Sequence, residues 1–164
     1  MAFLTIVRSY RNVLMALLVV STLTTSCKKS GGSDPDIDPR EQYVGTYDGD
    51  YRITIYIGSD GLTPDVGKIN VAVTKASNPK EMYFDMSYDG NVKERVTAEL
   101  NGDTFTIIDK KTDQITLTPT NKVSSDYAAT GSFTSNQLLL NASANALRNG
   151  TQYSKKYDII ATRK

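Results

Sequence analysis

The sequence predicts an all-β domain in which sequential antiparallel strands close into an up-and-down barrel. Apolar and polar residues alternate with a period of two through most of the chain after residue 40, which is typical of strands with one buried face. Asn-Gly, Asp-Gly and similar turn sequences separate the alternating runs at short intervals. No stretch after residue 40 shows a helical period. The length of 164 residues allows one such domain together with targeting and linker segments.

The N-terminal segment is interpreted as a secretory signal peptide covering residues 1–26. Residues 1–12 contain Arg8 and Arg11 and no acid, and an unbroken apolar run of eight residues follows from Val13 to Val20. That run is shorter than the ~20 residues that a permanent membrane span requires. It is also apolar on every face, which argues against a surface helix of the mature protein.

Cys27 is the only cysteine, and it ends the stretch Leu23-Thr24-Thr25-Ser26-Cys27. This stretch resembles the processing site of Gram-negative bacterial lipoproteins, although their usual leucine position is Thr24 here. The resemblance implies cleavage before Cys27 and attachment of three acyl chains such as palmitate. It also implies anchoring in the cell envelope, at the periplasmic face or the cell surface of the outer membrane. The alternative role for a lone exported thiol is a disulfide between molecules.

The segment after Cys27 is predicted to be a flexible, disordered tether. Residues 28–40 are rich in Gly, Ser and Pro and offer almost no apolar surface to bury. The predicted organisation is therefore a signal peptide (1–26), a lipidated linker (27–40) and a barrel domain (41–164).

Eight or nine strands are expected in a mostly sequential meander. A closed barrel arranges them without leaving an unpaired edge, and a two-sheet β-sandwich is the alternative. The two differ in whether the first and last strands pair. The alternating runs are 53–57, 68–73, 82–88, 96–100, 105–107, 115–117, 129–133, 138–142 and 157–161.

The entry to the first strand, Tyr43-Val44-Gly45-Thr46-Tyr47, resembles the aromatic-x-Gly-x-aromatic opening of calycins, the superfamily that includes the lipocalins. In lipocalins the second aromatic residue is usually a tryptophan that plugs the closed end of the barrel beneath a basic residue of the last strand. The resemblance implies that Tyr47 is the plug and Arg163 its cover.

Several reaction classes are excluded by composition. With no histidine and one cysteine, the chain offers no Ser-His-Asp or Cys-His catalysis and no zinc site built on those residues. No Gly-rich loop enters a helix, and 19 basic against 18 acidic side chains give no basic stripe for nucleic acid. The protein is therefore predicted to be no enzyme and to hold no cofactor or metal. The carboxylates that remain are Asp48 with Asp50, Asp109 with Asp113, and Glu94 with Glu99.

The preferred functional hypothesis is binding of a small apolar or amphipathic ligand in or at the mouth of the barrel. An eight-stranded barrel is just wide enough to hold one small ligand or to be filled by its own side chains. The alternative is an accessory or adhesion module with a solid core, which contacts a protein or glycan through Tyr56, Tyr83 and the loops Gly58–Gly67 and Pro119–Asp126. The candidate cavity residues are Ile53, Ile55, Met82, Phe84, Met86, Val96 and Phe105.

Overall fold

The computed structural model describes residues 38–164. The signal segment 1–26, Cys27 and the tether up to residue 37 lie outside the described residues, so their interpretation stays a prediction. The described part of the chain contains no helix with the length and hydropathy of a membrane span.

Strands dominate the described residues. A single short 3₁₀ helix, η1, precedes them. The elements are η1 (Pro39–Tyr43), β1 (Gly45–Ile57), β2 (Asp60–Gly61), β3 (Asp65–Lys75), β4 (Glu81–Tyr88), β5 (Val92–Asn101), β6 (Thr104–Ile107), β7 (Thr112–Thr118), β8 (Asn121–Thr134), β9 (Gln137–Arg148) and β10 (Thr151–Arg163).

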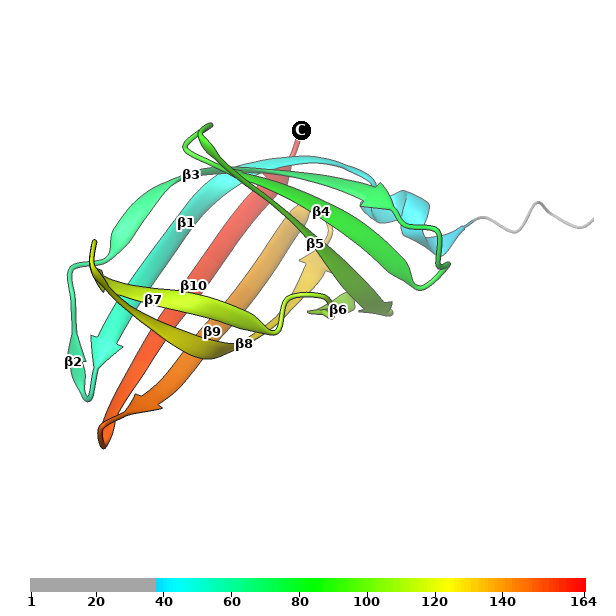
Figure 1. Ribbon diagram of the computed structural model, residues 1–164. Coiled ribbons are helices and arrows are strands. Elements are labelled where there is room, and N and C mark those ends of the chain that lie inside the picture. The colour runs from blue at the N-terminus through cyan, green and yellow to red at the C-terminus, as the bar shows by residue number, and fades with distance from the viewer. Residues whose placement is uncertain (1–37) are drawn as a thin grey trace, which may run out of the picture. The chain divides into compact units, whose positions relative to one another are not determined.

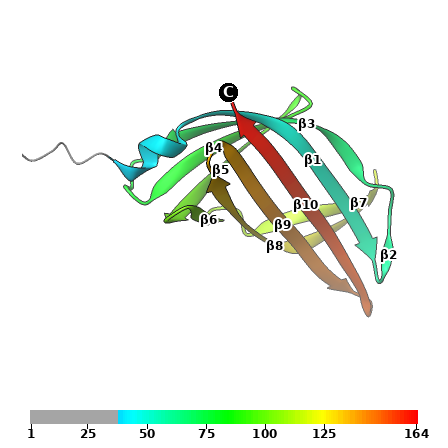
Figure 2. The same ribbon diagram turned by 180° about the vertical axis from the view of Figure 1, so that it is seen from behind.

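Eight of these strands form a closed antiparallel barrel in the order β1-β3-β4-β5-β6-β8-β9-β10 (Figure 1). The first and last strands pair over their whole shared length, from Tyr47 opposite Arg163 to Ile57 opposite Tyr153. Figure 2 shows β1, β10 and β9 side by side. This closure confirms the barrel and excludes the open sandwich. The two remaining strands lie off the ring, with β2 paired to β1 and β7 paired to β8.

Tight hairpins connect the strands where the sequence predicts them. Asp89 and Gly90 have φ values of 47° and 74°, and Asn149 and Gly150 have φ values of 52° and 76°. Two consecutive positive φ angles are typical of the type I′ turn, whose twist matches that of the flanking strands. The turns therefore hold β4 against β5 and β9 against β10 in the register that the alternating pattern requires.

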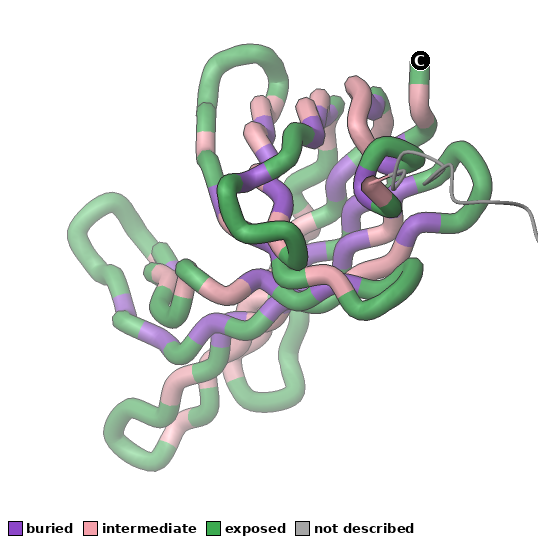
Figure 3. The backbone as a smooth tube through the Cα atoms, turned by 90° about the vertical axis from the view of Figure 1, so that its right-hand side faces the viewer, coloured by how far each residue is buried: buried purple, intermediate pink, exposed green. Residues whose placement is uncertain are grey.

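The barrel core is formed by the inward side chain of every second residue. Buried positions alternate along the strands, while the turns are exposed (Figure 3). Three phenylalanines meet in the half of the barrel beside η1, where the Phe133 ring stacks on Tyr43: the ring of Phe105 lies 4.8 Å from that of Phe84 and 5.3 Å from that of Phe133. Each buried aromatic side chain contributes about 1.5–3 kcal/mol through removal of apolar surface from water. The interior around Phe84 is therefore a packed core.

One end of the barrel is closed by η1. Arg40 is only 8% exposed, and its guanidinium donates to the carbonyl oxygens of Ala76, Asn78 and Glu81 at 2.9, 2.7 and 3.0 Å. Asp38 accepts from the Arg40 backbone and side chain and so caps η1. These contacts fasten residues 38–40, which the sequence analysis placed in the tether, to the barrel.

Tyr47 and Arg163 lie at this closed end, directly opposite each other across β1 and β10. The Tyr47 side chain is 2% exposed, and its hydroxyl donates to the Tyr43 carbonyl oxygen at 2.9 Å. Arg163 donates to the carbonyl oxygens of Gln42 and Val44 at 2.9 and 2.5 Å. Arg163 therefore ties the end of the last strand to the segment that enters the first.

Replacing Tyr47 by phenylalanine is expected to lower the free energy of unfolding by about 1 kcal/mol, because the Tyr43 carbonyl then loses its buried donor. Chemical denaturation of the full chain measures this change. Tyr83→Phe, which removes a hydroxyl from the outward row of β4, should change stability by less than about 0.5 kcal/mol. Equal effects of the two substitutions would contradict the role assigned to the Tyr47 hydroxyl.

The predicted loop Pro119–Asp126 is wrong. Only Pro119 and Thr120 form the turn between β7 and β8, and β8 begins at Asn121. The alternation of Val123 and Ser125, both buried opposite β7, continues the strand pattern to the turn. The predicted loop Gly58–Gly67 is also shorter than expected, because β3 begins at Asp65.

The ladder of backbone hydrogen bonds around the barrel has a gap between β5 and β7, which we call the side opening. Strand β5 pairs with β6 only from Ala98 to Asn101, and β7 pairs only with β8. Within the described topology, the first half of β5 from Val92 to Val96 therefore has a strand neighbour on its β4 side alone. Arg40 of η1 contacts the connection between β3 and β4, at the start of β4. The turn Asp89–Asn91 lies at the other end of β4, so the first half of β5 and the side opening lie in the half of the barrel away from η1.

Candidate functional site

The inward-facing rows change chemical character in the half of the barrel away from η1. On β5 the inward row runs from Ala98 through Val96 to Glu94, and on β10 it runs from Ile159 through Tyr157 to Lys155. Strand β7 places Asp113 in the same row as buried Ile115. Charged side chains thus occupy positions that the strand pattern assigns to the interior.

These side chains line a recess of about 590 Å³, which we call the mouth recess. It opens beside the gap between β5 and β7, and its walls come from β1, β3, β4, β5, β7 and β10 with the connection before β7. Its volume lies in the range of small-molecule sites. The lining residues are Tyr51, Ile53, Asp65, Tyr88, Asp89, Asn91, Val92, Lys93, Glu94, Lys110, Asp113, Lys155 and Tyr157.

Alternating charges connect the two sides of the opening. Lys110 Nζ lies 2.6 Å from Glu94 Oε1 on β5 and 4.0 Å from Asp113 Oδ1 on β7. Lys155 Nζ of β10 lies 3.2 Å from Asp113 Oδ2. The four side chains are only 18–29% exposed. Lys110 therefore links β5 and β7 where backbone pairing between them is missing.

Burial and neighbouring charges act against each other at Asp113. Burial raises the pKa of this carboxyl, but the Tyr157 hydroxyl, the Gln114 backbone and the charges of Lys155 and Lys110 outweigh it and hold the pKa below its ordinary value. Burial, followed by the hydrogen bond to Asp113, raises the pKa of Tyr157. At neutral pH the recess therefore presents an ionised Asp113 and an un-ionised Tyr157 that donates to it.

Asp113 is expected to make stability depend on acid pH. A carboxyl whose pKa is lowered by folding stabilises the native state above the unfolded-state value of about 3.9, and this contribution disappears as pH falls through the native-state pKa. Wild type should therefore be more stable than Asp113→Asn at about pH 6, and the difference should shrink at about pH 2–3. Urea unfolding at both pH values measures it.

The control for this titration is Asp158→Asn, because Asp158 is exposed on the outward row of the same barrel. It should change the free energy of unfolding by less than about 0.5 kcal/mol at both pH values, as expected for a substitution on the exposed surface. A constant difference for Asp113→Asn as well would contradict the coupling of this carboxylate to Tyr157 and Lys155.

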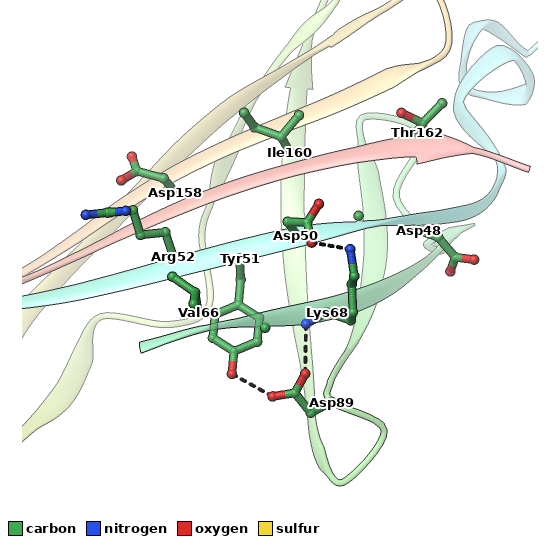
Figure 4. A pocket seen from close by; sticks show the side chains of 12 residues that line it. Asp48, Asp50, Tyr51, Arg52, Val66, Lys68, Asp89, Asp158, Ile160 and Thr162 are labelled. Carbon is green, nitrogen blue, oxygen red and sulfur yellow. Dashed lines mark hydrogen bonds and ion pairs between the residues drawn. The ribbon is translucent and has the colours of Figure 1, made fainter. Parts of the chain in front are cut away.

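Tyr51 and Asp89 close another side of the mouth recess. Figure 4 shows the Tyr51 ring pointing toward Asp89 and away from Arg52 and Asp158. The Tyr51 hydroxyl donates to Asp89 Oδ2 at 2.8 Å, and the Lys68 backbone N–H donates to the other carboxylate oxygen at 2.7 Å. The bond to Asp89, with burial, raises the pKa of Tyr51 to about 12.

A second depression, of about 750 Å³, lies on the outer face of β1, β3 and β10 (Figure 4). It contains the predicted carboxylate pair Asp48 and Asp50. Asp50 pairs with Lys68 at 2.6 Å, with side chains 70% and 80% exposed, and Asp48 pairs with Lys164 at 2.5 Å. Exposed pairs of this kind are solvated and contribute little energy. The mouth recess is therefore the better candidate site although its volume is smaller.

The predicted cavity residues separate into two groups. Ile53 lines the mouth recess, and Ile55 lies two residues further along β1, partly exposed. The other five are buried in the core cluster, and contact between them and a ligand stays a prediction. They are Met82, Phe84, Met86, Val96 and Phe105.

The sequence analysis did not select Lys110, Lys155 or Tyr157 as site residues, and it listed Glu94 and Asp113 only as remaining carboxylates. The alternation of inward and outward side chains along a strand identifies two of these positions. Glu94 lies two residues before Val96, and Lys155 lies two residues before Tyr157, so both continue inward rows. Lys110 lies in the connection between β6 and β7, where side chains do not alternate between inward and outward positions.

Among residues 38–164, no group of three or more His, Cys, Asp or Glu side chains is arranged to hold a metal ion.

Comparison with known proteins gives structural similarity only. No protein-family model matches the chain, and no curated protein matches it. A crystal structure of a protein of unknown function from the DUF3598 family of Nostoc punctiforme matches 76% of this chain with 13% identity and a TM-score of 0.38. A mutant of the vaccine antigen transferrin binding protein B from Haemophilus parasuis matches 74% with 14% identity and a TM-score of 0.38. The matched regions cover 48% and 28% of those chains.

Proposed function

We propose that this chain is a non-enzymatic, lipid-anchored protein of the cell envelope, which binds a small amphipathic molecule in the mouth recess. The observation that carries the binding proposal is the mixed lining of this recess. Apolar and aromatic surface from Ile53, Tyr88 and Tyr157 lies beside the ion pairs of Glu94 and Asp113. Sites for small molecules combine such apolar walls with a few fixed polar groups.

The lipocalin-like resemblance supports the position of this site. Tyr47, Arg163 and η1 occupy one end of the barrel, and the mouth recess lies in the half away from them. The proposed anchor rests on the N-terminal sequence, in which a signal-like segment ends at Cys27. Outer-membrane attachment belongs to the same proposal.

Native mass spectrometry of the full-length protein, purified from membranes of the producing cells, tests the binding proposal. We expect one low-mass molecule per chain. Ile53→Arg, which places a long charged side chain in the recess, should abolish the adduct, whereas Ile160→Arg on the exposed outer row of β10 should preserve it. Circular dichroism verifies that both variants fold. Protein without any adduct, or an adduct that survives in Ile53→Arg, would overturn the proposal.

A further inference from the structure

The half-buried charges of the mouth recess are arranged in neutral pairs, and three further charged lining residues, Asp65, Asp89 and Lys93, are exposed. Glu94 is matched by Lys110, and Asp113 is matched by Lys155, within 2.6 and 3.2 Å. Asp89 is satisfied by the Tyr51 hydroxyl and the Lys68 backbone N–H. The half-buried part of the wall therefore carries strong hydrogen-bonding groups whose charges are balanced within each pair.

Filling a barrel interior with ion pairs carries a large free-energy cost of desolvation. Removing two charges from water costs several kcal/mol per ion, and well-packed apolar residues of similar volume are often equally stable or better. The neighbouring inward positions Val96 and Ile115 carry apolar side chains. The inward charges of Glu94 and Asp113 thus have a stronger rationale in recognition than in stability.

Paired charges retain capacity for further hydrogen bonds. A carboxylate accepts about four hydrogen bonds and an ammonium group donates three. Among the described residues, Glu94 accepts one side-chain bond, from Lys110, and Lys155 donates to Asp113 and to the Gln114 carbonyl at 3.2 and 3.4 Å. A ligand hydroxyl placed beside a pair can donate to the carboxylate and accept from the ammonium group at once, while the two charged groups stay in contact.

The charge balance selects the ligand class. An ionic ligand that contacts the half-buried wall would have to separate Glu94 from Lys110 or Asp113 from Lys155, and one half-buried charge would then lose its partner. A neutral hydroxyl-bearing ligand keeps both pairs intact. Carbon–hydrogen faces of the same ligand can pack on Ile53 and the tyrosine rings. Carbohydrates combine these two kinds of surface.

We propose that the mouth recess binds a neutral carbohydrate, with its hydroxyl groups bonded to the Glu94–Lys110 and Asp113–Lys155 pairs. This inference rests on the proposed ligand-binding function and specifies its ligand. The paired hydroxyl contacts provide orientation, and the aromatic wall provides apolar contact.

Ligand-observed NMR with the full-length protein, in a detergent without a sugar headgroup, tests this inference. The probes are glucose, galactose and N-acetylglucosamine as neutral sugars, with glucosamine and glucuronic acid as charged analogues. At least one neutral sugar should bind at least about tenfold more tightly than either charged analogue, because an ionic ligand must break a pair. Its dissociation constant should change less than about twofold between about 50 and 500 mM NaCl.

Matched variants locate the contact. Glu94→Gln and Lys155→Met should each weaken binding of the neutral sugar at least about tenfold, because a charge-assisted hydrogen bond is lost. Glu99→Gln on exposed β5 and Lys156→Met on exposed β10 should leave it unchanged. Thermal unfolding of each variant verifies that the barrel is intact.

Preference for a charged analogue, or unchanged binding by both Glu94→Gln and Lys155→Met, would overturn the carbohydrate inference. Absence of sugar binding while native mass spectrometry detects another bound molecule would overturn this inference and leave the proposed function standing. Absence of any bound molecule in both experiments would overturn both.

Discussion

Replacing Gly49 by alanine is expected to lower the free energy of unfolding by more than about 3 kcal/mol, because the added methyl group collides with backbone. An alanine β-carbon at this position would lie 2.0 Å from the Ile160 carbonyl oxygen and 2.5 Å from the Ala161 α-carbon. Gly49 pairs with Ala161 on β10 and with Ile69 on β3. The collision therefore affects the seam where the barrel closes. Urea denaturation monitored by circular dichroism measures the loss.

Gly61→Ala is the matched control. A β-carbon there would approach only the Tyr56 ring, at 3.1 Å, in the short outer strand β2. Because a side chain can shift where backbone cannot, this substitution should cost less than about 1 kcal/mol. If Gly49→Ala were as stable as wild type, the close pairing of β1 with β10 would be contradicted.

Substituting Cys27→Ser is expected to move nearly all of the protein from the membrane fraction to the soluble fraction. Two acyl chains already suffice for stable anchoring, so loss of three removes essentially all of the binding energy. The barrel should remain folded, because the described domain begins at Asp38. Fractionation of cells followed by immunoblotting measures the shift, and thermal unfolding verifies the fold.

Ser30→Ala, three residues beyond the cysteine, is the control and should remain in the membrane fraction. Mass spectrometry of the wild-type N-terminus should show acyl groups on Cys27. Retention of Cys27→Ser in carbonate-washed membranes would contradict the proposed anchor.

The barrel was predictable because strand patterns are local. Period-two runs indicate which face of each strand is buried, and sequences such as Asn149-Gly150 indicate where the chain reverses. Closure also follows, since a meander of this length buries its edges only by pairing β1 with β10. The same logic extends to Glu94 and Lys155, which lie in inward rows despite their charge.

The parts that escaped prediction depend on contacts between distant residues. The 3₁₀ helix η1 has five residues and no periodicity, and Arg40 is held by carbonyl groups 36–41 residues away. Lys110 lies in a connection, and its partner Glu94 is 16 residues earlier. Charged residues are ordinarily solvated, so their burial in pairs is visible only once the strands are placed.

The distinction between packed core and cavity also required the structure. A sequence with bulky inward side chains is compatible with a packed core and with a cavity, and only the packing of those side chains in the structure distinguishes the two. Phe84 is fully buried against Phe105, whereas Ile53 borders the mouth recess. The candidate site therefore lies in the half of the barrel away from η1, and the packed phenylalanines lie in the half beside it.

The most direct test of the central claim is a crystal structure of the full-length protein purified without denaturation from its own cells. We predict electron density for a small molecule in the mouth recess, between Tyr88 and the Asp113–Lys155 pair. Density for a ligand in the outer depression beside Asp50 and Lys68, or a mouth recess that contains only water, would contradict the claim.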